Sequence, residues 1–142
     1  MVSNLLYAVG GSDGSVNYSN VYCYNGATWT EAASLPAARQ FIALATLNGA
    51  LYAMGGDDGS NATNVYRFDG STWTEMAGLP AARTMLCAGA LDGVFYAIGG
   101  FNGADRTNVY RCDGSSWVEM PGLPAPRTYS AASARAASDD AT

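Results

Sequence analysis

The sequence contains no histidine and no lysine, and its seven basic residues are all arginine. These absences exclude whole classes of chemistry, because serine and cysteine triads, histidine-ligated metals, Schiff bases and P-loop nucleotide sites each need one of the missing side chains. Twelve acidic residues give a net charge of −5, and no basic stripe offsets it, so nucleic acid is an unsuitable partner. We therefore expect no catalytic residue, no metal site and no cofactor.

Long apolar runs are also missing. No stretch of about 18 apolar residues occurs, so the sequence predicts no membrane-spanning helix. The N-terminal stretch MVSNLLYAVGG has no basic residue ahead of its short apolar run, which disfavours a secretory signal. The three cysteines Cys23, Cys87 and Cys112 lack metal-site spacing and are interpreted as small apolar residues within strands. These features favour a cytoplasmic location and leave open the secretion of a longer parent protein.

One segment of the sequence occurs three times. It reads VYRFDGSTWTEMAGLPAAR at Val65–Arg83, and close copies occupy Val21–Arg39 and Val109–Arg127. The tryptophans of successive copies are 44 residues apart, at Trp29, Trp73 and Trp117. Self-similarity at a fixed period of this size indicates a repeat architecture.

Each complete unit reads as four short strands in a meander, which we name a to d. In the middle unit the predicted strands are Phe41–Leu47, Ala50–Met54, Val65–Phe68 and Ser71–Glu75, and in the third unit strands a and b are Met85–Leu91 and Val94–Ile98. Asn-Gly and Asp-Gly pairs between strands favour tight hairpins. Strands a and b are apolar at nearly every position, so both faces of the sheet are covered. Such sheets, repeated along a chain, predict an all-β propeller.

Three features recur in phase with these strands: a glycine pair after strand b, a tyrosine and a tryptophan separated by six residues, and an arginine opening the next unit. They are Gly10-Gly11, Gly55-Gly56 and Gly99-Gly100; Tyr22 with Trp29, Tyr66 with Trp73 and Tyr110 with Trp117; and Arg39, Arg83 and Arg127. The pattern resembles the kelch repeat. This resemblance implies a kelch-type β-propeller with three four-stranded blades, in which these residues form the framework.

The two ends of the sequence are out of phase with the blades. Ser3-Asn4 aligns with Asn48-Gly49, so the first unit begins inside an a–b turn and contains three strands. Residues 127–134 align with Arg83–Ala90 and read as a strand a without its neighbours. Kelch propellers resemble this arrangement where they close, because a C-terminal strand completes their first blade.

Three blades are too few for a ring, since propellers typically have about 4 to 8. We therefore expect residues 1–134 to form three blades and two chains to close a six-bladed C2 homodimer. In it, residues 127–134 complete the first blade of the partner, and residues 135–142 form a frayed tail. The alternative is a piece excised from a longer propeller.

Candidate binding residues lie in the b–c loops, Ser12–Asn20, Asp57–Asn64 and Phe101–Asn108, and at the start of strand a. The loops differ while the framework repeats, which is typical of segments that bind. Arginine forks suit carboxylates or acidic peptides, although the repeated arginines also fit a structural role. The predicted ligand-binding residues are Arg39, Arg83, Arg127, Arg106, Asp57, Asp58, Asn61 and Asn102.

The resemblance implies a non-catalytic binding or scaffold module that recognises a protein or peptide through its b–c and d–a loops. One alternative is a protein that binds or processes an acidic sugar with an arginine and carboxylate site. Copper oxidase chemistry, known in some kelch propellers, is excluded because the sequence has no histidine. Another alternative is an engineered or fragment half-propeller whose only property is self-assembly, since units two and three match at 15 of 20 positions from Val65 and Val109 onward.

Overall fold

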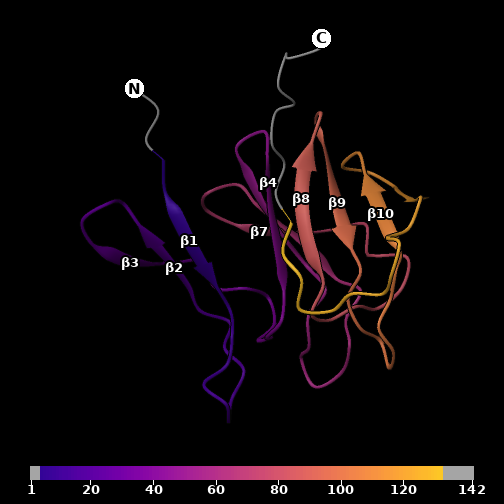
Figure 1. Cartoon of the computed structure of the whole chain (residues 1–142). Helices are drawn as coiled ribbons and strands as arrows, with labels where there is room; N and C mark the ends of the chain where they lie inside the picture. The colour runs from indigo at the N-terminus through magenta and orange to yellow at the C-terminus, as the bar shows by residue number, and fades with distance from the viewer. Residues whose placement is uncertain (1–3, 133–142) are drawn as a thin grey trace.

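The computed structural model describes residues 4–132, which form three antiparallel sheets (Figure 1). We call them blades 1, 2 and 3. Blade 1 contains β1 (Leu6–Val9), β2 (Val21–Tyr24) and β3 (Trp29–Ala32). Blade 2 contains β4 (Ala43–Leu47), β5 (Ala50–Met54), β6 (Val65–Phe68) and β7 (Trp73–Met76). Blade 3 contains β8 (Cys87–Leu91), β9 (Val94–Ile98), β10 (Val109–Cys112) and β11 (Trp117–Met120).

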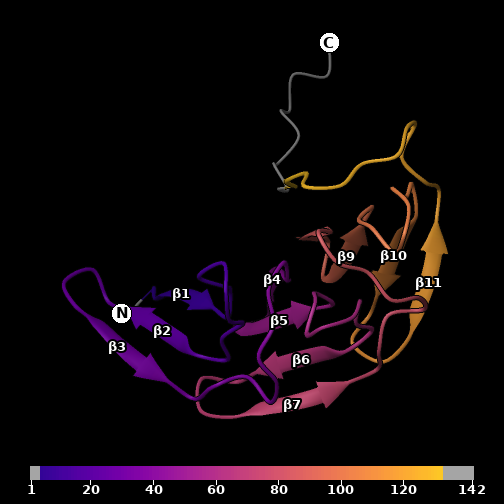
Figure 2. The same cartoon turned by 90° about the horizontal axis from the view of Figure 1, so that it is seen from below.

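The blades stand side by side in an arc, as Figure 2 shows. Within each blade the strands follow chain order from the inside of the arc to its outside, so that β3, β7 and β11 lie on the outer rim. Sequential pairing of this kind confirms the predicted up-and-down meander. Blade 1 and β11 lie at opposite ends of the arc.

Most strand boundaries agree with the sequence prediction, and the differences have local causes. The strands β4 and β8 each begin two residues later than predicted, because Phe41 and Met85 have left-handed backbone angles of φ 56° and 57°. The strand β7 begins at Trp73 because residues 71 and 72 belong to the preceding turn, where the Asp69 carboxylate accepts their backbone N–H groups at 2.8 and 2.9 Å. These hydrogen bonds stabilise the carboxylate and lower the pKa of Asp69 to about 2.

The segment after β11 is not part of a sheet in the described residues. Arg127 forms an isolated bridge with Arg106, and residues 128–132 form no strand. Blade 1 accordingly has three strands in this region, with β1 at its inner edge. The pairing of residues 127–134 with blade 1 of a second copy stays a prediction. Residues 133 and 134 of this segment, and the predicted tail 135–142, lie outside the described residues.

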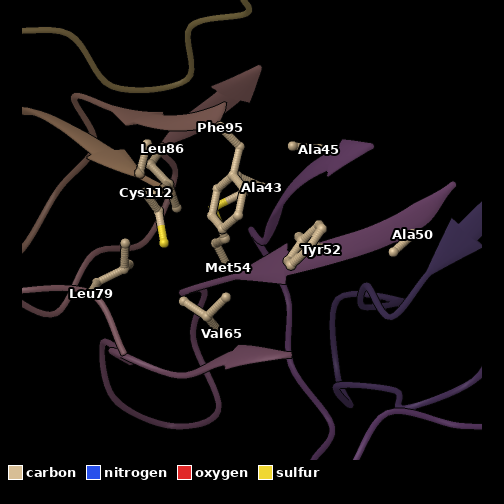
Figure 3. Packing of buried hydrophobic residues seen from close by; sticks show 11 residues of the cluster. Ala43, Ala45, Ala50, Tyr52, Met54, Val65, Leu79, Leu86, Phe95 and Cys112 are labelled. Atoms are coloured by element: carbon tan, nitrogen blue, oxygen red, sulfur yellow. The ribbon is translucent and has the colours of Figure 1, made fainter. Parts of the chain in front are cut away.

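The hydrophobic core lies between the faces of neighbouring blades. Between blades 2 and 3, the rings of Tyr52 and Phe95 are 4.5 Å apart, and Met54, Val65 and Leu79 are buried beneath them (Figure 3). The outer rim is also joined, because the indole N–H groups of Trp73 and Trp117 each donate to a carbonyl of the preceding blade. Trp73 reaches Ala33 O at 2.8 Å, and Trp117 reaches Ala77 O at 2.9 Å.

The cysteines and the membrane prediction can be compared with the structure directly. Cys87 and Cys112 are buried in β8 and β10, and Cys23 is half-buried in β2; all three are free thiols. Burial raises the pKa of the Cys112 thiol. Within residues 4–132, no helix is long and apolar enough to cross a membrane.

The glycine pair is where neighbouring blades approach most closely, and this generates a prediction. Gly55 has φ +62°, and a Cβ there would collide with the Arg83 carbonyl of the next blade. We expect Gly55→Ala to destabilise the chain by about 2 kcal/mol or more, since strain and steric overlap add. Urea unfolding followed by tryptophan fluorescence measures the change.

Gly89→Ala is the matched control, because Gly89 lies in β8 with ordinary backbone angles and no heavy atom within 4 Å of a Cβ. We expect its free energy of unfolding to stay within about 0.5 kcal/mol of the unchanged chain. Equal losses from the two substitutions would contradict a special role for the glycine pair.

Candidate binding face and buried arginines

The three b–c loops project from the same side of the arc, at the lower edge in Figure 1. Their backbones have related shapes, because each is closed by one short bridge: Ser12 with Asn17, Asp57 with Asn61, and Phe101 with Asp105. Neighbouring loops also touch, since the Asn17 amide donates to Asp57 O at 3.1 Å. The structure therefore brings the predicted loop residues to one face.

The charges of the described loops are mainly negative. Asp13, Asp58 and Asp105 are exposed. The Asp13 carboxylate accepts hydrogen bonds from the Tyr18 hydroxyl at 2.7 Å and from two backbone N–H groups, which lower its pKa to about 2. Arg106 is half-buried, and its Nε donates to Asn102 Oδ1 at 2.6 Å within the same loop.

Arg39 lies beneath this face. Only 1% of its surface is exposed. Its guanidinium donates to Gly55 O at 3.1 Å and to the Tyr66 hydroxyl at 3.5 Å, and its carbon lies 5.3 Å from the centre of the Tyr66 ring. Asp58 Oδ2 is 3.7 Å from Arg39 Nη2, which makes this the one ion pair among the described residues. Burial raises the pKa of Tyr66, while the neighbouring Arg39 charge opposes that rise.

Arg83 occupies the equivalent position one blade further along, and the framework tyrosine is again one of its partners. It is 3% exposed, and its guanidinium donates to the Asn108 side-chain oxygen at 2.9 Å and to the Tyr110 hydroxyl at 3.4 Å. Its carbon is 5.8 Å from the centre of the Tyr110 ring. Desolvation lowers the pKa of Arg83 without approaching neutral pH. In these two blades the arginines therefore take the structural role that the sequence left open.

A repeated asparagine–glutamate pair was not predicted from the sequence. In each blade an asparagine two residues before the framework tyrosine donates to a glutamate two residues after the framework tryptophan. The three pairs are Asn20–Glu31 at 2.8 Å, Asn64–Glu75 at 2.7 Å and Asn108–Glu119 at 2.7 Å. Their fixed positions in every unit were the available signal. The pair leaves the asparagine oxygen free to face an arginine, as Asn108 does toward Arg83.

Arg127 differs from its two counterparts. Its backbone is held by blade 3, because Gly100 N donates to Arg127 O at 2.8 Å and Arg127 N donates to Arg106 O at 3.1 Å. Its side chain is exposed and donates only to Pro126 O, at 2.8 Å, among the described residues. The structure thus places one framework arginine at the surface.

The remaining predicted site residues are distributed over the loops. Asp57 and Asn61 share a backbone bridge in the blade 2 loop, and both are half-buried. Asn102 is half-buried beside Arg106. Within residues 4–132, no three acidic or cysteine side chains are grouped as metal ligands.

The arc of meandering sheets, with its glycine pairs, rim tryptophans and buried arginines, has the features of a β-propeller-like repeat protein. The sequence profile described as the Kelch motif matches residues 1–36 and 38–80. The chain therefore belongs to the kelch-repeat family. Members of this family commonly mediate protein–protein interaction and are generally non-catalytic.

The chain is also similar to Kelch-like protein 21 of Rattus norvegicus. The two are 42% identical over 55 residues, which are 37% of this chain and 9% of that relative. The chain thus corresponds to a small part of that protein's length.

The buried arginines generate a second prediction. We expect Arg39→Ala to lower the free energy of unfolding by about 2 kcal/mol, because it removes the donors of Gly55 O and the Tyr66 hydroxyl inside the fold. The loss is moderated because Arg39 Nε is buried without a partner among the described residues. Urea denaturation at pH 7 checks the value.

Arg67→Ala is the control, because it removes the same charge from β6, where Arg67 is half-buried. We expect a change below about 0.5 kcal/mol. If the two variants were equally stable, burial of Arg39 would not contribute to the fold.

Proposed function

We propose that this chain is a non-catalytic kelch binding module that recognises a protein or peptide through the face built by its b–c loops. The observation that carries the proposal is that three loops of related backbone shape lie on one side of the arc and differ in their side chains. A constant framework that presents variable loops is typical of recognition surfaces. Family membership supports a protein partner for this face.

The charge of the face favours a cationic segment of the partner. Arg39 and Arg83 are buried beneath the loops, so they do not offer their forks to an acidic ligand. The exposed carboxylates of Asp13, Asp58 and Asp105 remain. Complementary potentials steer encounter and favour partners of opposite charge. The burial of these arginines also removes the main support for an acidic-sugar site.

We further propose that two copies of the chain close a six-bladed ring. The support comes from the outward faces at the two ends of the arc. Leu6 of β1 is 60% exposed, whereas Phe95, which occupies the equivalent position in β9, is 1% exposed between two blades. Edge strands and apolar blade faces that lack a neighbour favour association.

The ring is tested by the mass of the unchanged 142-residue chain. We expect a species of twice 14.7 kDa at micromolar concentration in sedimentation equilibrium. A monodisperse species of 14.7 kDa, or an open series of larger oligomers, would contradict the ring.

The binding face is tested by selecting peptides from a random phage-displayed library on the immobilised chain. We expect the selected peptides to be enriched in arginine and lysine over the library. A double variant, Asp58→Asn with Asp105→Asn, removes two exposed loop charges, and urea unfolding verifies that its framework is intact, because Asp58 also pairs with Arg39. Binding of the selected peptides, measured by calorimetry, is expected to weaken at least about tenfold.

A matched double variant removes the same charge from the opposite side of the arc. Asp69→Asn with Asp113→Asn changes the c–d turns, where Asn25 already makes the equivalent turn bonds in blade 1. We expect its affinity to stay within about twofold of the unchanged chain. Equal weakening by both double variants, or recovery of no specific peptide, would refute the loop face as the binding surface.

A further inference from the structure

The framework arginine has a repeated binding site, and one copy of that site is empty of arginine. In blades 2 and 3 the framework tyrosine contacts the arginine; Arg39 also donates to the carbonyl of the glycine after strand b, Gly55, and Arg83 also donates to the asparagine of the Asn–Glu pair, Asn108. In blade 1 the equivalent glycine, asparagine and tyrosine are Gly10, Asn20 and Tyr22. Together with Tyr18 they line an open pocket of about 260 Å³. Tyr22 is 44% exposed, against 6% for Tyr66 and 7% for Tyr110.

The chain also carries an arginine without such a site. Arg127 stands where Arg39 and Arg83 stand in the repeat, and its backbone makes the same two bonds to the blade before it. Gly11, Gly56 and Gly100 donate to Arg39 O, Arg83 O and Arg127 O at 2.9, 2.9 and 2.8 Å. Blade 3 therefore already positions the Arg127 backbone as it is positioned in a filled site. Among the described residues its guanidinium has no tyrosine partner such as Tyr66 or Tyr110, and it donates to Pro126 O instead.

We propose that the pocket of Gly10, Asn20 and Tyr22 is a guanidinium socket that receives Arg127 of a second copy of this chain. This inference rests on the proposed ring and names the residues that lock it. By analogy with both arginines, the guanidinium donates to the Tyr22 hydroxyl and lies near the Tyr22 ring. The Gly10 carbonyl, as in the Arg39 site, and the Asn20 side-chain oxygen, as in the Arg83 site, are its further acceptors. A charge-assisted hydrogen bond with a stacked ring is among the stronger polar contacts.

Two further rows of hydrogen bonds join neighbouring blades within the chain, and both can be extended to the proposed junction between two copies. On the inside of the arc, Met85 N donates to Phe41 O and Tyr129 N donates to Met85 O, both at 3.1 Å. All three residues have left-handed backbone angles, of φ 56°, 57° and 53° in chain order. Because left-handed angles are unfavourable for bulky residues, their repetition at Phe41, Met85 and Tyr129 indicates a regular contact between neighbouring blades. Its continuation is Phe41 N of one copy donating to Tyr129 O of the other.

The outer row continues in the same way. Trp73 and Trp117 donate to the carbonyls of Ala33 and Ala77 in the blade before them. Trp29 is 52% exposed, and the residue equivalent to Ala33 and Ala77 after β11 is Pro121, which retains a carbonyl although it has no N–H. The junction between copies thus repeats a contact that the chain already makes twice within itself. A second copy is therefore the occupant that fits.

The same chain does not fill its own socket in this structure, because blade 1 and β11 lie at opposite ends of the arc (Figure 2). Two copies related by a two-fold axis satisfy both sockets at once. Each copy contributes one arginine and one socket, so each junction joins two different surfaces. Two such junctions close the ring.

The test compares Arg127→Ala with Arg111→Ala in the full chain. Arg111 lies in β10 and is half-buried, so its substitution removes the same charge from the same blade. Dissociation constants are measured by sedimentation at the urea concentration where the unchanged dimer is half dissociated. We expect about tenfold weaker association per socket, and thus about a hundredfold for the two sockets of a ring with Arg127→Ala. Arg111→Ala is expected to stay within about twofold. Circular dichroism verifies that both variants are folded.

A complementation experiment separates the socket from a general loss of association. Tyr22→Ala damages the socket, and Arg127→Ala removes its occupant, so a mixed dimer has one intact socket and one that lacks both partners. Each variant alone has two damaged junctions. We expect the equimolar mixture to dimerise about tenfold more tightly than either variant, because removing the second partner of a broken contact costs little.

The outcomes are distinguishable. A monomeric unchanged chain contradicts the ring and with it the socket. A dimer whose dissociation constant changes equally little with Arg127→Ala and Arg111→Ala, or a mixture no tighter than its components, overturns the socket and leaves the ring standing. Preferential weakening by Arg127→Ala, together with recovery in the mixture, supports the inference.

Discussion

The structure depends on the close backbone approach between the glycine pair of one blade and the arginine that opens the next. Gly56 N donates to Arg83 O at 2.9 Å, and a Cβ on Gly55 would overlap that same carbonyl. Only a residue without a side chain, and with access to positive φ, permits this distance. The approach fixes where strand a begins, and it places the arginine side chain over its own blade. Burial of the guanidinium needs that blade as well, because Arg127 makes the same backbone contact and is exposed.

Much of this framework could be predicted from the sequence, because it repeats. The hairpins at Asn48-Gly49 and Asp69-Gly70 and the meander follow from local turn chemistry and apolar patterning. Such features depend on short segments, and three in-phase copies make them unambiguous.

The contacts that the sequence did not predict join residues that come together only when the chain has folded. Phe41 and Met85 adopt left-handed angles that bulky residues rarely occupy, so local propensity favours extending the strand through them. The Asn64–Glu75 pair joins residues 11 positions apart, which meet only once β6 and β7 have paired. Arg39 and Arg127 have the same residue type and repeat position, yet one is buried and the other exposed. That difference depends on whether a neighbouring blade is present, which the repeat pattern does not encode.

The position of the loops on one side of the arc has a consequence for valency. In a ring of two chains, each b–c loop occurs twice, on opposite sides of the central axis. In the proposed ring the face would therefore present two identical recognition surfaces at a fixed separation. A partner that carries its epitope twice, or is itself two-fold symmetric, engages both at once, and the second contact forms at the high effective concentration set by the first. Dissociation of such a ring would convert the bivalent surface into two monovalent ones, so the strength of partner binding would depend on the concentration of the chain.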